Sequence, residues 1–345
     1  MLQVWWLSLA LCAGAFGTLG WLIVARQLRD RRDVARAALQ QTLRDALLAH
    51  LGGAHEAANK VAAWRGRAVL AAQVLLQYVA LIGGAERQAL VRVMSDAGLD
   101  EAMRRRAGRS SKAGRLSCLE ALGCFSDTAS LDVLRRATLE ADADIRLAGW
   151  RALRAAGARV GVLQLLHQPG FNDPSPPLSY CEFLQQVAET DTAGAIAALS
   201  VTSLTTAVRQ RLVAAVGRTG ADRSGSMLLR IASDDEPIIR AEALKALAGR
   251  PLPLPVPLLL QAMVADAWEV RAEAVAALVG RESADMLPLA ASLLDDASWP
   301  VRQKAAEVLS ASGDDGLQRL KAAAESGSPR ARLAASLALT QRAAA

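Results

Sequence analysis

An arginine recurs at a nearly constant interval along this chain, and this regularity restricts the fold more than any other feature. The seven arginines are Arg115, Arg146, Arg209, Arg240, Arg271, Arg302 and Arg332. Their spacings are 31, 63, 31, 31, 31 and 30 residues, and 63 is two periods plus one residue. Self-similarity at a fixed period of this length is typical of a repeat protein, in which each unit packs on its neighbours.

The residues around each arginine have a helical pattern. Small or apolar residues stand one position before the arginine and three, six and seven positions after it, as in Val270, Ala274, Ala277 and Leu278 around Arg271. These positions share one face of an α-helix. Acidic or Ser/Pro turns that suit a helix start precede these segments.

A second helical segment follows each arginine segment, and a glycine that suits a left-handed helix end usually lies between the two. The second helices are expected over residues 128–139, 158–167, 193–199, 225–231, 256–263, 284–294 and 315–324. Each unit is therefore a pair of helices in about 31 residues, and stacked pairs form an all-α, right-handed superhelix.

The pattern Asp-x-x-x-Val-Arg-x-x-Ala-x-x-Ala-Leu, which ends at Leu278, resembles a HEAT repeat. The match is to the short form found in HEAT-like bilin lyases and related bacterial scaffolds, and it extends over residues 84–345. The resemblance implies a solenoid in which each arginine pairs with a turn aspartate of its own or the neighbouring unit, as a structural ladder. The alternative is a row of arginines that binds phosphate, but the nearby aspartates would neutralise such a row.

One unit has lost its arginine. One period after Arg146 comes Pro177, inside a Pro-rich turn that begins near Gln168. One interpretation is a degenerate repeat that changes the pitch of the superhelix. The other is a partner-binding turn with an exposed Phe171, supported by Tyr180 and Phe183, because exposed aromatic residues are typical interface anchors.

The amino terminus has the composition of a membrane anchor. Residues 2–25 contain no charged side chain, and tryptophans lie near both ends of this stretch, which is long enough to cross a bilayer as one helix. One alternative is a cleaved signal peptide, but no positively charged n-region precedes the stretch. The other is a lipoprotein modified at Cys12, but Leu11 is too large for the residue before a modified cysteine. Five arginines follow the stretch: Arg26, Arg29, Arg31, Arg32 and Arg36. The positive-inside rule therefore predicts a single-pass inner (plasma) membrane protein with its solenoid in the cytoplasm.

Residues 26–83 are expected to join this transmembrane anchor (residues 1–25) to the solenoid (residues 84–345). The stretch 26–51 is amphipathic, with Leu43 and Leu47 on its apolar side. The apolar stretch 68–82 contains Gln73 and Gln77 and is short for a second span, so it is expected to be a buried capping helix, which solenoid ends require.

The formal net charge of +6 is concentrated in one predicted turn. Its basic residues are Arg104, Arg105, Arg106, Arg109 and Lys112, followed by Arg115. They form either a solvated turn or a site for anionic lipid, nucleotide phosphate or another anion. Nucleic acid is a weaker hypothesis, because only 4% of the residues are aromatic and few bases could stack on them.

No catalytic, nucleotide-binding or metal-binding motif occurs in the sequence, so no enzyme activity, cofactor, metal or small-molecule substrate is expected. The leading hypothesis is a membrane-anchored scaffold for a protein partner. The Ala, Arg and Leu bias is typical of a high-GC bacterium. The resemblance to membrane-linked HEAT scaffolds implies an envelope or exopolysaccharide complex as partner. The alternatives are a HEAT-like enzyme, similar to bilin lyases or DNA glycosylases, and an anion- or nucleotide-binding regulator acting through Arg104–Arg115.

Overall fold

The computed structural model describes residues 21, 26–27, 37–47, 49, 57–200, 203–219, 222–250, 252–279 and 286–344. These residues contain helices and turns, and no strand occurs among them. The chain divides into two compact units, residues 1–159 and residues 160–345.

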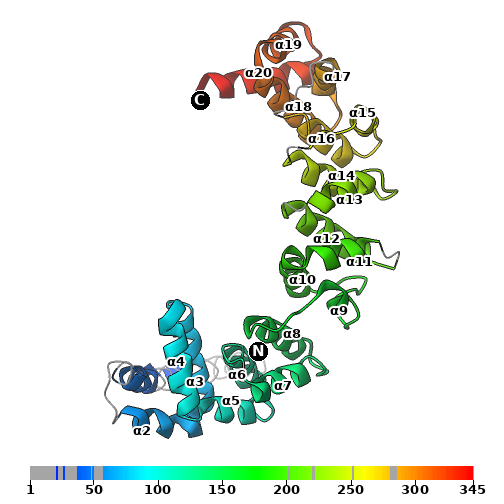
Figure 1. The fold of residues 1–345 in the computed structure, drawn as a ribbon. Helices are drawn as coiled ribbons and strands as arrows, with labels where there is room; N and C mark the ends of the chain where they lie inside the picture. Colours follow the sequence, from blue (N-terminus) through cyan, green and yellow to red (C-terminus); the bar gives the residue numbers. More distant parts are fainter. Residues whose placement is uncertain are drawn as a thin grey trace, which may run out of the picture. The chain divides into compact units, whose positions relative to one another are not determined.

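The first unit is a stack of short helices (Figure 1). They are α2 (Ala57–Ala62), η1 (Ala63–Arg67), α3 (Ala68–Val79), α4 (Gly84–Asp96), α5 (Leu99–Ala107), α6 (Lys112–Leu122), α7 (Thr128–Ala137) and α8 (Ala143–Ala155). Helix α3 packs on α5 and α6, and α6 and α7 pack on α8. The arginine helices α6 and α8 are therefore neighbours in this stack.

The segment before α3 contributes to the same unit. Residues 37–47 are helical, and Leu43 and Leu47 on their apolar side are buried. The Arg44 Nε donates to Tyr78 Oη of α3 at 2.9 Å. Since α3 also packs on α5 and α6, the predicted capping segment and the first repeat helices share contacts within one unit.

The second unit repeats one helix pair along the chain (Figure 1). Its helices are α9 (Val162–Leu166), α10 (Leu178–Thr190), α11 (Thr192–Leu199), α12 (Thr206–Arg218), α13 (Asp222–Ile231), α14 (Pro237–Ala248), α15 (Val256–Met263), α16 (Trp268–Ala276), α17 (Leu287–Ser292), η3 (Leu293–Asp295), α18 (Trp299–Ala311), α19 (Gly313–Ser326) and α20 (Pro329–Ala344). Helices α10, α12, α14, α16, α18 and α20 each pack on the next, and α11, α13, α15 and α19 pack beside them. Two layers of helices result, as in a solenoid.

The apolar periodicity explains this packing. The residues one before and three and seven after the arginine are fully buried in α14, namely Ile239, Ala243 and Leu247. The equivalent residues of α16 and α18 are buried in the same way. Small residues at the third position let neighbouring helices approach closely, so the spacing in the sequence sets the register of the stack.

The turns follow the expected capping chemistry in part. The Asp142 Oδ1 accepts from the backbone N–H groups of Asp144 and Ile145 at the start of α8. Gly157 and Gly313 have positive φ values of 85° and 67°, as predicted for glycines at helix ends. Gly217 has another role, because it lies inside α12 and a Cβ there would stand 2.5 Å from the Ala246 Cβ.

The predicted fold class requires a correction at its membrane helix. A spanning helix needs about 20 apolar residues, and no described helix combines that length with that apolarity. The longest described helix, α20, has 16 residues and contains charged side chains. The anchor predicted over residues 2–25 lies outside the described residues except for Trp21. The described helices therefore do not support the predicted transmembrane helix or the predicted single-pass inner-membrane location.

Candidate functional site

The arginine row runs along the turns between repeats, and most of its members bind the turn that precedes their own helix. The Arg271 Nη1 donates to the carbonyl oxygens of Ala265 and Asp266 at 2.7 and 2.8 Å. Arg146, Arg240 and Arg302 make the same pair of bonds, at positions six and five before the arginine. These bonds fix the guanidinium plane and leave its opposite edge free for a second partner.

In alternate members that edge holds a carboxylate from the next turn. The Arg271 Nε and Nη2 donate to the two oxygens of Asp296 at 2.8 and 2.9 Å. Pairs 25 residues apart also join Arg209 to Asp234, through Nη1 and Nη2, and Arg115 to Glu140, through Nη2 alone. A fork of two parallel N–H···O bonds is the strongest geometry between arginine and a carboxylate.

The same turn residue also serves the following arginine. The Asp296 side chain binds Arg271, while its backbone carbonyl accepts from Arg302. Asp234 bridges Arg209 and Arg240 in the same manner. Of the two predicted partners, a turn aspartate of the same or of the neighbouring repeat, the second holds for Arg271: Asp296 supplies the carboxylate, and the exposed Asp266 of its own turn supplies only its carbonyl.

The pKa values of the paired aspartates are lowered by their arginine partners. Burial alone would raise the pKa of Asp296, but hydrogen bonds from Arg271 and from the Ser298 N–H outweigh it and lower that pKa below its ordinary value. The same causes, with Arg209 as donor, lower the pKa of Asp234. Both carboxylates are therefore ionised at neutral pH.

The remaining arginines lack such a carboxylate. Phe171, Ala265 and Gly327 stand 25 residues after Arg146, Arg240 and Arg302. Within the described ranges no carboxylate forms an ion pair with these three guanidinium groups. Arg302 instead lies over the Trp299 ring, with its Cζ 5.5 Å from the ring centroid, and Arg332 is exposed on α20. The structural role of the arginine ladder stays a prediction. Its carboxylate contacts occur at every second arginine.

The basic turn predicted to bind anions is largely occupied by its own carboxylates. Arg104 binds Asp100 and Asp127 at 2.8 and 3.2 Å, and Arg105 pairs with Glu101. Lys112 binds Asp142 and Asp144 at 2.9 and 2.6 Å. Arg106 and Arg109 are exposed in the same region. These pairs reduce the positive potential that an anion would encounter.

The aromatic residues of the degenerate unit are core residues. Phe171 and Phe183 are 1% exposed and Tyr180 is 2% exposed. The Phe171 ring centroid lies 4.7 Å from that of Tyr180 and 6.3 Å from that of Phe183. The predicted exposure of Phe171 is therefore wrong: the Pro-rich turn folds its ring inward onto α10, so it cannot anchor a partner from the surface.

The Pro-rich turn also forms hydrogen bonds with the turn of the next repeat. The Asn172 amide donates to the Ser203 carbonyl and accepts from the Thr205 N–H, both at 3.1 Å. These bonds reach the turn before α12, where other units use an arginine. The degenerate unit thus keeps its helix pair, α10 and α11, with an asparagine in place of the lost arginine contact.

Large apolar side chains are exposed on the arginine helices of the second unit. Trp268, Trp299 and Leu337, on α16, α18 and α20, are 43%, 41% and 42% exposed. Trp268 and Trp299 each stand three residues before a ladder arginine. Their repeat spacing of 31 residues was the signal that distinguishes them from the tryptophans of the amino terminus, and they were not among the predicted site residues.

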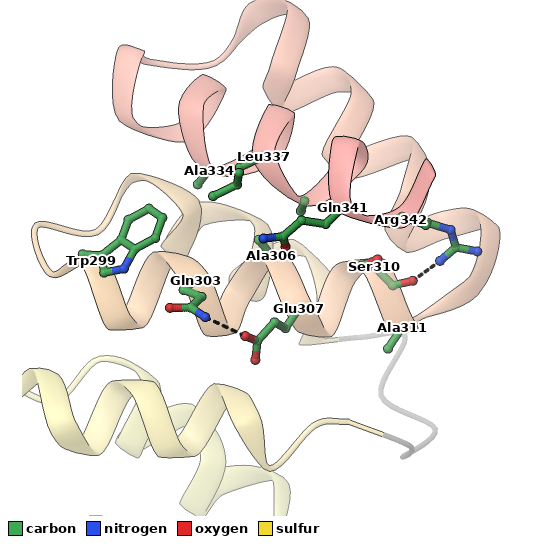
Figure 2. Close-up of a pocket in the computed structure, with 11 residues that line it drawn as sticks. Trp299, Gln303, Ala306, Glu307, Ser310, Ala311, Ala334, Leu337, Gln341 and Arg342 are labelled. Carbon is green, nitrogen blue, oxygen red and sulfur yellow. Dashed lines mark hydrogen bonds between the residues drawn. The ribbon is translucent and has the colours of Figure 1, made fainter. Parts of the chain in front are cut away.

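A groove of about 430 Å³ opens between α18 and α20, beside Trp299 and Leu337 (Figure 2). Its floor is formed by Ala306 and Ala334, and the Gln303 amide donates to the Glu307 carboxylate at 3.0 Å on its edge. The residue two after the arginine is Ala334 in α20, whereas the three preceding repeats carry Glu242, Glu273 and Lys304 there. The short side chain leaves the space that forms this groove.

Comparisons with known proteins agree with this architecture. A family model described as HEAT repeats matches residues 255–340. No curated protein matches the sequence. The karyopherin Kap121p is similar in structure, with 14% identity and a TM-score of 0.51 over 86% of this chain and 39% of its own. Kap95p in a structure with RanGDP is similar at 14% identity and a TM-score of 0.51, over 88% of this chain and 48% of its own. The chain spans less than half the length of either protein, and this likeness concerns the fold.

Residues 255–340 thus contain HEAT repeats, and the described helices form a HEAT-type, karyopherin-like solenoid fold. The features specific to bilin lyases are not shown by these similarities. Within the described residues, no three His, Cys, Asp or Glu side chains are grouped so that they could hold a metal ion.

Proposed function

We propose that this chain is a HEAT-repeat scaffold that binds a protein partner through the arginine-helix layer of its second unit. The observation that carries the proposal is the exposure of Trp268, Trp299 and Leu337 on successive helices of that layer. Exposed large apolar side chains that gather on one face are typical of protein-binding surfaces, and tryptophan is the strongest anchor at such surfaces. Kap95p, a solenoid of similar fold, binds RanGDP.

The groove between α18 and α20 offers a place for an apolar side chain of the partner. Its alanine floor and its Trp299 and Leu337 walls are apolar, and Gln303, Glu307 and Arg342 add polar groups at its margins. An apolar pocket with a polar rim is the usual anatomy of an interface centre. The membrane complex predicted as partner depended on the membrane span and is not part of this proposal.

The test compares proteins that co-purify with the tagged chain and with two variants. Trp299→Ala combined with Leu337→Ala removes both walls of the groove. Leu139→Ala, on an exposed leucine of the other unit, removes apolar surface away from it. We expect quantitative mass spectrometry to show a protein that binds the wild type and the Leu139 variant at equal levels and is lost, about tenfold or more, from the groove variant. Equal recovery of every co-purifying protein by all three chains would refute the proposal.

The alternative of an anion-binding regulator has less support. Arg104 and Arg105 pair with Asp100 and Glu101 of their own helix, and Lys112 pairs with Asp142 of a neighbouring turn. A phosphate group would have to displace these partners before it reached the guanidinium and ammonium groups. The protein-binding surface needs no such exchange.

A further inference from the structure

A polar cavity of about 600 Å³ lies between the turn that precedes α14 and the segment from α15 to the start of α16. Arg240, Asp235, Leu258, Ala265 and Asp266 are among its lining residues. Asp234 also lines it, but the position 25 residues after Arg240, where a carboxylate would bridge to the next repeat, is Ala265.

Arg240 and Arg271 are anchored in the same way. The Arg240 Nη1 donates to the carbonyl oxygens of Asp234 and Asp235 at 2.8 and 3.0 Å, as the Arg271 Nη1 does to its own turn. In Arg271 the other edge of the guanidinium, Nε and Nη2, holds both oxygens of Asp296. In the part of the chain that the structure describes, no hydrogen bond occupies that edge of Arg240.

The difference arises from one side chain. Asp296 stands 25 residues after Arg271, and the equivalent residue after Arg240 is Ala265, which lines the cavity. Arg302 also lacks a carboxylate, but the Trp299 ring lies against it. Arg240 has Pro237 at the position equivalent to Trp299. Arg240 thus lines the cavity with Nη1 anchored on two turn carbonyls, while its Nε and Nη2 make no hydrogen bond within the described residues.

We propose that this cavity binds a carboxylate of the protein partner, an Asp or Glu side chain, through Nε and Nη2 of Arg240. The ligand carboxylate would accept hydrogen bonds from Arg240 as Asp296 does from Arg271. The planar guanidinium fork recognises carboxylates bidentately, and its anchoring on two carbonyl groups means that little conformational entropy is lost on binding.

The charged side chains at the rim of the cavity determine which kind of partner segment can bind there. Asp235 and Asp266 are exposed at the cavity, and within the described residues neither side chain forms an ion pair. They oppose a free anion and attract a cation close beside the bound carboxylate. The site therefore suits an acidic residue flanked by lysine or arginine, rather than a small free carboxylate. This inference rests on the proposed function, since it names one contact of the partner.

The test uses the full chain and the peptide acetyl-Lys-Glu-Lys-amide, with acetyl-Lys-Gln-Lys-amide and sodium acetate as comparison probes. Titration is followed through the ¹⁵N–¹H signals of the arginine Nε groups. We expect the Glu peptide to shift the Arg240 signal saturably and to bind about tenfold or more tightly than either comparison probe.

Three variants locate the contact. Arg240→Ala should abolish binding of the Glu peptide. Ala265→Asp should also abolish it, because it places an internal carboxylate on the fork, and it should raise the melting temperature above that of Ala265→Asn. Arg302→Ala is the matched control, since it removes a ladder arginine outside the cavity, and binding should persist.

Equal binding by the wild type, Arg240→Ala and Ala265→Asp would overturn the inference. Acetate binding as tight as that of the Glu peptide would overturn the assignment to a protein segment. The two proposals can fail separately. Loss of the co-purifying protein in the Trp299 and Leu337 variant, but not in Arg240→Ala, would sustain the scaffold and refute the carboxylate contact.

Discussion

Replacement of Arg271 by alanine removes four hydrogen bonds to the turns that precede and follow its repeat. Two of them go to Asp296, whose side chain is 7% exposed, from an arginine that is 16% exposed. After the substitution the Asp296 carboxylate keeps one of its donors, the Ser298 N–H at 2.7 Å. The variant therefore leaves a largely buried carboxylate with too few partners.

The magnitude follows from this burial. Breaking a buried ion pair by removing one partner costs about 3–5 kcal/mol, and partial exposure together with the remaining Ser298 bond places Arg271→Ala near the lower limit, at about 3 kcal/mol. Arg240→Ala is the matched control, because it loses only the two bonds to turn carbonyls. We expect it to cost about 1 kcal/mol.

The assay is urea unfolding of the full chain followed by circular dichroism, with hydrogen exchange of α16 and α18 as a local measure. Stacked repeats open in parts, so the local measure separates the loss at this step from changes elsewhere. A double-mutant cycle with Asp296→Ala should show favourable coupling of about 1–2 kcal/mol. Equal destabilisation by Arg271→Ala and Arg240→Ala, or no coupling with Asp296, would refute the assignment of the carboxylate pair.

Three further outcomes are expected. Because the pKa of Asp296 is lowered in the fold, its contribution is present above its ordinary value of 3.8 and is lost as the pH falls below it; the melting temperature of the wild type should therefore fall more steeply below about pH 4 than that of Asp296→Asn. Phe171→Ala should lower the free energy of unfolding by about 3–5 kcal/mol in chemical denaturation, and a change below about 1 kcal/mol would contradict the aromatic core. Burial raises the pKa of Cys118 to about 11, so iodoacetamide at neutral pH should modify it only after unfolding, as peptide mass spectrometry can show.

The repeat period predicted much of the architecture because it records which side chains meet between layers. The second helix expected over residues 256–263 is α15 with the same bounds, and α7 begins at Thr128 as expected. The helix expected over residues 284–294 is divided into α17 and η3. Period alone cannot show such a division, since it depends on local packing of the last turn.

Phe171 shows why burial within a turn was harder to predict. Four prolines and a glycine around it indicated an exposed loop. The glycine is Gly170, with a φ of 94°, and a Cβ there would stand 2.7 Å from the Tyr180 ring. The tight backbone approach turns the chain inward, so the Phe171 ring joins the core. A loop composition predicts where the chain bends, but not which side of the bend packs.

The alternation of the arginine row was present in the sequence, at a separation that local reasoning does not examine. The sequence allowed each arginine a turn aspartate of its own or of the neighbouring repeat. In the structure a turn residue presents its carbonyl to its own arginine and its side chain to the preceding one. The relevant position is 25 residues after the arginine, where Glu140, Asp234 and Asp296 alternate with Phe171, Ala265 and Gly327. Asp234 therefore links the repeats of Arg209 and Arg240, and Asp296 links the repeats of Arg271 and Arg302. The step from Arg240 to Arg271 has no such bridge, and this is the step at which the cavity opens.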